Sequence, residues 1–168
     1  MLPDPLHPAV VHFPIVLMVL LPFVAAGALW AIRRGARPAR AWALPLAAAA
    51  ALTLSSWVAV ETGEGEEEKV EPVVAEASLH RHEEDAERFL LLSGVLFVIT
   101  AAGLLRGVPG RAARLGATVG ALGLVALGAQ VGHSGGNLVY REGAASAYTR
   151  GAAGGPMAAD RESGKVDD

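Results

Sequence analysis

Five histidines are the side chains in this sequence best suited to bind a metal or a cofactor, and all of them lie near the ends of long apolar runs. They are His7, His12, His80, His82 and His133. An imidazole at the edge of a hydrocarbon layer is costly unless it has a partner, so histidine in this position indicates a functional site. The sequence contains no cysteine, which excludes thiolate ligands and covalently attached c-type haem. Histidine and carboxylate are therefore the strong ligands that remain.

The elements that must position these histidines are four apolar runs. The chain is 52% hydrophobic, and its apolar residues gather at about 10–32, 41–60, 89–105 and 115–131. About 20 apolar residues in a helix cross a bilayer that is about 30 Å thick, so these runs predict four transmembrane helices. We expect an all-α integral membrane protein, an up-down bundle of four helices within residues 1–143.

Charged residues separate into loops of opposite sign. Arginines follow the first and third runs, whereas residues 61–87, between the second and third runs, are strongly acidic. Under the positive-inside rule the arginine loops face the cytoplasm. The acidic outer loop 61–87 and both termini then face the outside, which is the periplasm if the bilayer is a bacterial inner membrane. All five histidines fall on that side.

The heights of the histidines predict a shared site near the outer face. His12 lies just inside the apolar boundary of the first run, and His133 just beyond that of the fourth, so the two match in height. The helical rise of about 1.5 Å per residue puts His82 roughly 10 Å farther out, near the height of His7. The short connections of an up-down bundle would bring these helix ends together.

The helical phase of the third segment predicts which of its side chains face inward. His82, Phe89 and Ser93 fall on one stripe, which points His82 into the bundle. Residues 83–85 then face mostly toward water. His80 lies about 200° around the helix from His82 and is the weakest ligand candidate.

The end of the fourth run and the residues after it are rich in glycine and alanine. We expect Gly132–Gly136 to form a helix C-terminal cap and a turn. We expect residues 144–168 to form a disordered C-terminal tail because they lack apolar residues that a core would need.

Haem b fits these ligands and is the cofactor that we expect. Bis-imidazole ligation needs two opposed histidines and a slot lined by small residues, which the glycine-rich fourth run would supply. The axial ligands would come from His12, His82 and His133, and His7 would be a supporting group or belong to a second site. Arg81 or Arg141 would pair with the propionates. The expected role is electron transfer, or that of an accessory subunit of a redox complex.

Two other uses of the same residues stay open. A non-haem site for a zinc, copper or iron ion, in a protein that binds or transports divalent metals, would take its ligands from the same histidines together with acidic residues. That set is His7, His12, His82, His133, Glu61 and Glu83. The second alternative is a structural bundle without a cofactor, in which the histidines only sense pH.

Four motifs resemble the bacterial predicted membrane proteins grouped as domain of unknown function twenty-two thirty-one. They are His7-Pro8-x-x-Val11-His12-Phe13-Pro14-Ile15, Thr62-Gly63-Glu64, His82-Glu83 and Gly132-His133-x-Gly135-Gly136-x-Leu138-Val139-Tyr140. The resemblance covers about residues 6–143. It implies a four-helix membrane domain, which in some relatives is joined to cytochrome-like or Rieske-type modules, and so favours redox chemistry.

The expected partners follow from the membrane and redox readings. They are the lipid bilayer and a cytochrome, a Rieske-type protein or a quinol, and we expect no nucleic acid. The chain would act as a homo-oligomer or as one subunit of a larger complex.

Overall fold

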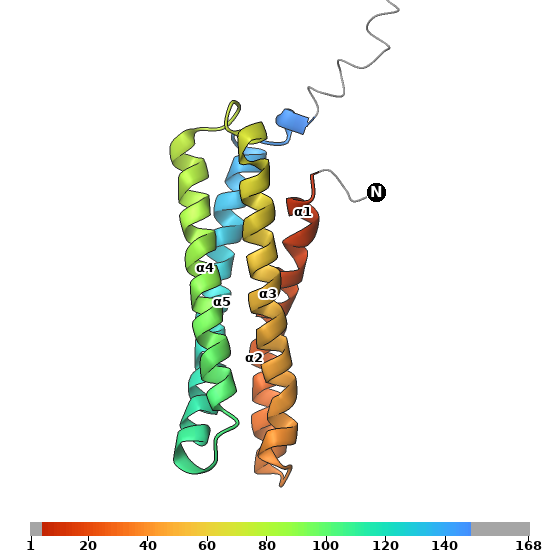
Figure 1. The fold of residues 1–168 in the computed structure, drawn as a ribbon, viewed down its shortest axis with the longest axis vertical. Coiled ribbons are helices and arrows are strands. Elements are labelled where there is room, and N and C mark those ends of the chain that lie inside the picture. Colours follow the sequence, from red (N-terminus) through yellow and green to blue (C-terminus); the bar gives the residue numbers. More distant parts are fainter. Residues whose placement is uncertain (1–4, 149–168) are drawn as a thin grey trace, which may run out of the picture.

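The chain folds into a long helical bundle (Figure 1). The structure is a computed structural model, and it describes residues 5–148. The helices are α1 (His7–Val10), α2 (His12–Arg33), α3 (Pro38–Val70), α4 (Glu76–Ala102) and α5 (Gly107–Tyr140). No strand occurs over these residues, so the prediction of an all-α fold is confirmed.

A single turn of helix, α1, precedes α2 and is separated from it at Val11. Pro14 explains this break, because proline has no N–H with which to bond the carbonyl four residues earlier, at Val10. The interruption is local, because Val11 keeps helical dihedral angles and its N–H still bonds the carbonyl of His7 at 3.1 Å. The turn before it carries His7.

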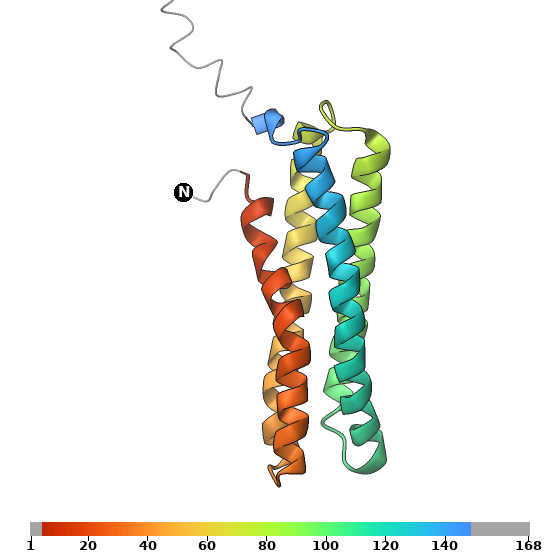
Figure 2. The same cartoon turned by 180° about the vertical axis from the view of Figure 1, so that it is seen from behind.

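The four long helices alternate in direction, and the two ends of the described chain lie at one end of the bundle (Figures 1 and 2). Helix α2 packs on α3 and α5, and α4 packs on the same two helices, so the four form a ring. Helix α1 packs on α2 and α3 but makes no helix contact with α4 or α5. We call the end that holds the termini the upper end, as in Figure 1.

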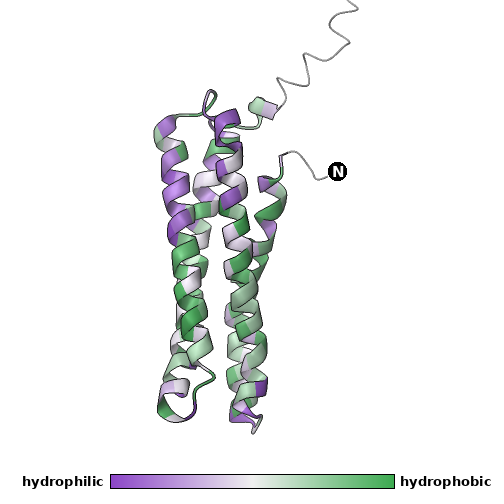
Figure 3. Cartoon of the chain, in the orientation of Figure 1, coloured by the Kyte–Doolittle hydropathy of each residue, from purple (hydrophilic) through white to green (hydrophobic). Residues whose placement is uncertain are grey.

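Three helical segments are long and apolar enough to cross a membrane by length and composition. They are His7–Arg33, Pro38–Val70 and Gly107–Tyr140. Large apolar side chains also cover the outside of the bundle: Phe23 is 71% exposed and Val119 is 68% exposed. Helices that are apolar all round suit a lipid environment. Figure 3 shows apolar residues over most of the bundle and hydrophilic residues on the upper parts of α3 and α4.

Helix contacts at the lower end satisfy polar groups inside the bundle. The Trp42 side chain is fully buried and donates its indole N–H to the carbonyl of Thr100 at 2.8 Å. The guanidinium of Arg114 donates to the carbonyl of Gly103, which follows α4. The Thr100 carbonyl also accepts from the N–H of Gly103 at 3.0 Å, whereas Arg114 supplies a donor for a carbonyl just beyond the helix end, of the kind that helix ends leave without partners.

The expectation of an acidic outer loop over residues 61–87 is wrong for most of that segment. Helix α3 continues to Val70 and α4 begins at Glu76, so only residues 71–75 connect them. Glutamate is a good helix former, and ion pairs one turn apart, such as Glu84 with Arg88 at 2.9 Å, add support. The two helices therefore extend well beyond their apolar parts.

Two expectations for the C-terminal part also differ from the structure. Gly132–Gly136, which we expected to end a helix, lies inside α5, and that helix continues to Tyr140. Within the expected tail 144–168, Ala144 is buried in a small cluster with Leu79 and Leu138. Residues 149–168 lie outside the described part of the chain.

Two glycines of α5 give a test of the packing. A Cβ on Gly128 would lie 2.1 Å from Sδ of Met18 and 3.0 Å from a ring carbon of Phe89, whereas a Cβ on Gly123 would meet no atom within 4 Å. Gly128→Val should lower the free energy of unfolding by about 1–3 kcal/mol through overpacking. Gly123→Val carries the same change in helix propensity and is the control. Reversible unfolding in detergent measures both, and equal losses would contradict the packing.

Candidate functional site

Two histidines face each other near the upper end of the bundle. The rings of His7, on α1, and His82, on α4, have centroids 6.5 Å apart and planes at 84°. Both side chains are partly buried. We expected His7 and His82 at similar heights, and the ring contact confirms it. Their helices do not pack on each other, so the two imidazoles approach from separate sides of the bundle.

A hydrogen bond determines which nitrogen of the His7 ring carries the proton. Nδ1 lies 2.8 Å from the carbonyl oxygen of Ala59, on α3. A carbonyl can only accept, so Nδ1 must be the donor. The neutral ring then has its lone pair on Nε2.

The same reasoning gives the tautomer of His82. Its Nδ1 lies 3.0 Å from the hydroxyl of Ser134, on α5. That hydroxyl donates its own proton to the carbonyl of Val131 at 3.0 Å, so its oxygen accepts from the ring. Nδ1 of His82 is therefore protonated, and the lone pair of the neutral ring lies on Nε2.

Neither Nε2 has a hydrogen-bond partner in the described part of the chain. Every fully buried side-chain nitrogen or oxygen there does have one, so each Nε2 keeps some accessible surface. Metal-ligating histidines typically donate their other ring N–H to a carbonyl or a similar acceptor, which fixes the ring and raises its basicity. His7 and His82 both have this arrangement.

Glycines provide the room that the two rings occupy. A Cβ on Gly63, on α3, would lie 3.2 Å from two atoms of the His7 ring. A Cβ on Gly135, on α5, would lie 2.9 Å from a ring carbon of His82. Each imidazole therefore lies against the backbone of a neighbouring helix. Glycine at that position has no Cβ, which lets the ring come this close.

A buried carboxylate lies one turn from His82 on α4. Asp85 is 3% exposed, accepts a hydrogen bond from Nε2 of Gln130 at 3.0 Å, and lies 3.7 Å from the guanidinium of Arg88. We expected Asp85 to face mostly toward water, and that is wrong. Asp85 lies only 60° from His82 around the helix, so the inward stripe of α4 includes both side chains.

The structure leaves His12 and His133 exposed, away from the facing pair. The buried residues of α2 include Pro14, Met18 and Leu21, and at 100° per residue His12 lies on the opposite face. His133 is likewise opposite the buried stripe of α5. His12 and His133, which we expected as axial ligands with His82, are therefore not brought to it, whereas the ring of His7 lies beside it.

The remaining candidates lie on the outer surface of the acidic helices. His80 is exposed and pairs with Glu84 at 3.4 Å, as its helical phase suggested. Glu61 is exposed. Glu83 lies 3.8 Å from His80, and its pKa is raised by partial burial and by the nearby charge of Glu67, an effect that His80 reduces. Over residues 5–148, no three histidine or acidic side chains are placed to hold one metal ion.

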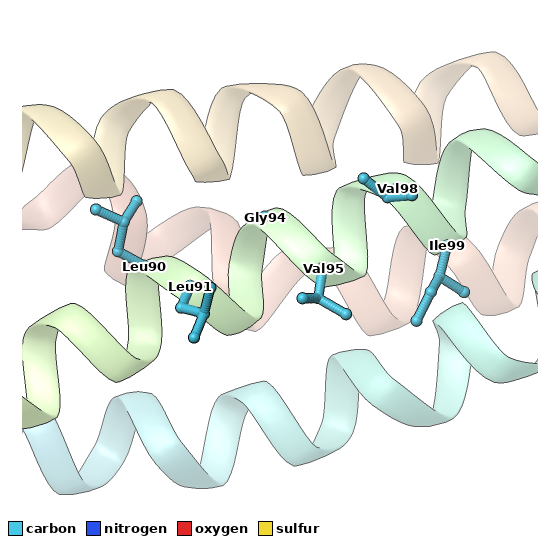
Figure 4. A pocket seen from close by; sticks show the side chains of 6 residues that line it. All are labelled: Leu90, Leu91, Gly94, Val95, Val98 and Ile99. Atoms are coloured by element: carbon cyan, nitrogen blue, oxygen red, sulfur yellow. The ribbon is translucent and has the colours of Figure 1, made fainter.

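A shallow apolar groove lies along another side of α4. Figure 4 shows the residues that line it, which come from the apolar part of the helix. They are Leu90, Leu91, Gly94, Val95, Val98 and Ile99. This lining offers no group for catalysis or ligation, and it suits contact with lipid.

The environment of His82 favours its neutral form. Burial, and then the neighbouring His7, lower the pKa of His82, while Asp85 and the Val131 carbonyl partly oppose the shift. His82 lies outside the apolar part of α4. A lowered pKa keeps the imidazole neutral near pH 7, and only the neutral form can bind a metal.

Comparison with known protein families, with curated proteins and with solved structures found no match.

The lowered pKa of His82 predicts that acid destabilises the protein. The unfolded chain binds a proton at the ordinary histidine pKa of about 6.5, so stability falls as the pH drops through that value toward the lower pKa of the folded state. The melting temperature in detergent should decline between about pH 7.5 and about pH 5.5. His82→Asn should decline less, because it keeps an N–H donor for Ser134 and does not titrate.

Exposed His80 provides the control for this effect, and His80→Asn should retain the decline of the unsubstituted protein. An equal acid sensitivity in all three proteins would show that His82 does not titrate as described.

Proposed function

We propose that this chain is a membrane electron-transfer protein that binds haem b between His7 and His82 near its upper end. The observation that carries the proposal is the pair of neighbouring imidazoles, whose ring centroids lie 6.5 Å apart. Each ring has its Nδ1–H engaged by an acceptor of the protein and its Nε2 lone pair without a partner. A bound haem would supply one-electron redox chemistry.

The distance between the two rings supports ligation of one ion from opposite sides. A bond between a metal and an imidazole nitrogen is about 2 Å long, so two imidazoles on opposite sides of one ion have centroids roughly 6 Å apart. The centroids of His7 and His82 are 6.5 Å apart.

The number of ligands favours haem over a non-haem ion. The macrocycle supplies the equatorial nitrogens of a haem iron, so the protein needs to supply only two axial ligands. Zinc takes three or four protein ligands. The site brings together two imidazoles, and the described residues contain no cluster of three suitable side chains.

The backbone around the two rings favours ligation between helices. Helix α1 does not pack on α4 or α5, so the side chains of His7 and His82 span the distance between their helices. Gly63 and Gly135 keep side chains away from the rings. Arg81 is exposed on the upper part of α4, where its charge suits a propionate.

The residues around the rings would hold the imidazoles in place when the iron changes its oxidation state. The carbonyl of Ala59 and the hydroxyl of Ser134 fix the two ring planes. Small changes in ligand position favour fast electron transfer. The electron partner would approach at the upper end, and a quinol, a cytochrome or a Rieske-type protein fits this role.

We also propose that all four long helices cross a bacterial inner membrane, with the upper end and both termini outside. Helix α4 is apolar from Phe89 to Ala102, and arginines at its lower end and at the α2–α3 turn would face the cytoplasm. This arrangement puts the two rings at the outer end of the bundle.

The motifs that resemble domain of unknown function twenty-two thirty-one come together at the site. Each of the four motifs contributes one residue to it, namely His7, Gly63, His82 and Gly135. These residues lie on α1, α3, α4 and α5, far apart in the sequence. We therefore propose that the chain belongs to this family and that the motifs are those of a cofactor site.

Substitution of single histidines tests the haem proposal. His7→Ala and His82→Ala should each remove an axial ligand and abolish the low-spin haem spectrum of the purified protein. His12→Ala and His133→Ala are matched controls, because these side chains are exposed away from the site, and their spectra should equal that of the unsubstituted protein. Visible absorption after titration with haemin measures the effect. The proposal fails if all four variants bind haemin equally.

The absence of cysteine allows a clean test of the topology. Ala75→Cys, between α3 and α4, should react with a membrane-impermeant maleimide in intact spheroplasts. Ala36→Cys and Leu105→Cys, at the two lower connections, should react only after the membrane is permeabilised. Labelling at residue 105 from outside, without labelling at residue 36, would show that α4 does not cross.

A further inference from the structure

One carboxylate connects three segments of the chain at the upper end of the bundle. Glu66, on α3, accepts hydrogen bonds through Oε1 from the backbone N–H of Leu6 at 2.7 Å and of His7 at 3.1 Å. Its Oε2 accepts from the hydroxyl of Tyr148 at 2.8 Å. The entrance of α1 and the end of the described chain are thus both fixed to α3.

Helix α1 depends on contacts of this kind. It has four residues, and no side chain of its own caps its first turn. A single turn of helix is not stable in isolation, and the N–H groups at its start need acceptors. A carboxylate is a strong acceptor for such groups. Glu66 supplies it from a long, well-anchored helix.

The partners of Glu66 also limit its own movement. Tyr148 holds the second carboxylate oxygen, and the ammonium group of Lys69 lies 5.9 Å from the centroid of the Tyr148 ring. Both carboxylate oxygens are therefore engaged. Because the Glu66 side chain is held in this way, its bonds fix the backbone of His7 relative to α3.

We propose that Glu66 is a positioning residue, which fixes the backbone of His7 so that its ring lies beside that of His82. This inference rests on the proposed function, because the proposed haem is the ligand that a correctly placed His7 would bind. Glu66 does not touch the ligand itself. It acts through the main chain of the histidine, and Tyr148 supports it.

Two substitutions separate position from charge. Glu66→Gln keeps an oxygen that accepts from both N–H groups, and its amide can turn toward Tyr148, so it should behave like the unsubstituted protein. Glu66→Ala removes the acceptor. Glu68→Ala removes an exposed acid on the same helix and is the control for lost charge. Tyr148→Phe removes only the supporting hydroxyl and leaves Glu66 in place.

The experiment measures two properties of each full-length protein in detergent. The first is amide hydrogen exchange over residues 5–11 without haemin, and the second is the affinity for haemin by titration. Glu66→Ala should exchange faster in this segment and bind haemin about 10- to 100-fold more weakly, as expected when a group that orients a ligand is lost. Glu66→Gln and Glu68→Ala should match the unsubstituted protein. Tyr148→Phe should show a smaller change in the same direction.

The outcomes distinguish this inference from the haem proposal. Unchanged exchange and affinity in Glu66→Ala, with normal haemin binding by the unsubstituted protein, would overturn the role of Glu66. A loss in Glu66→Gln as large as in Glu66→Ala would also overturn it, because charge would then be the cause. If the unsubstituted protein takes up no haemin but Glu66→Ala still exchanges faster over residues 5–11, the haem proposal fails and the positioning of His7 stands.

Discussion

A partly buried imidazole has two nitrogens that need partners, and the structure supplies a partner for only one of them in each of two facing rings. The carbonyl of Ala59 and the hydroxyl of Ser134 oblige Nδ1 of His7 and of His82 to donate. The lone pairs on Nε2 are then left without a donor in the described part of the chain. Both lone pairs keep accessible surface at the upper end of the bundle, so a ligand can reach them there. The other features of the upper end serve this arrangement.

The upper end is built by extending helices beyond their apolar parts. Helix α3 continues to Val70 and so carries Ala59, Gly63 and Glu66 up to the level of α1. Helix α5 continues to Tyr140 and brings Ser134 to His82. The acidic composition of this part keeps it soluble while glutamate preserves the helix. Segments that look like loops in the sequence thus become the frame of a site.

The sequence predicts the helical bundle well and the site only in part. Apolar runs indicate the helices, and the stripe through Phe89 and Ser93 gives the inward direction of His82. The outward direction of His12 could have been read from the phase of α2, since Pro14 lies 200° away from it. The prediction that His12 and His133 are ligands rests on their height along the helices and not on their helical phase. The hydrogen bond that the N–H of Leu6 donates to Glu66, 60 residues away, has no sequence signal, because Glu66 is one of many acids in its segment.

The most direct test of the account is the visible absorption spectrum of the full chain purified from a bacterial membrane, recorded after air oxidation and again after reduction with dithionite. Ligation by two histidines predicts a sharp Soret band that shifts on reduction, together with resolved α and β bands of a low-spin, six-coordinate haem. A colourless protein that remains colourless after incubation with haemin would contradict the account. The facing imidazoles would then be a structural pair.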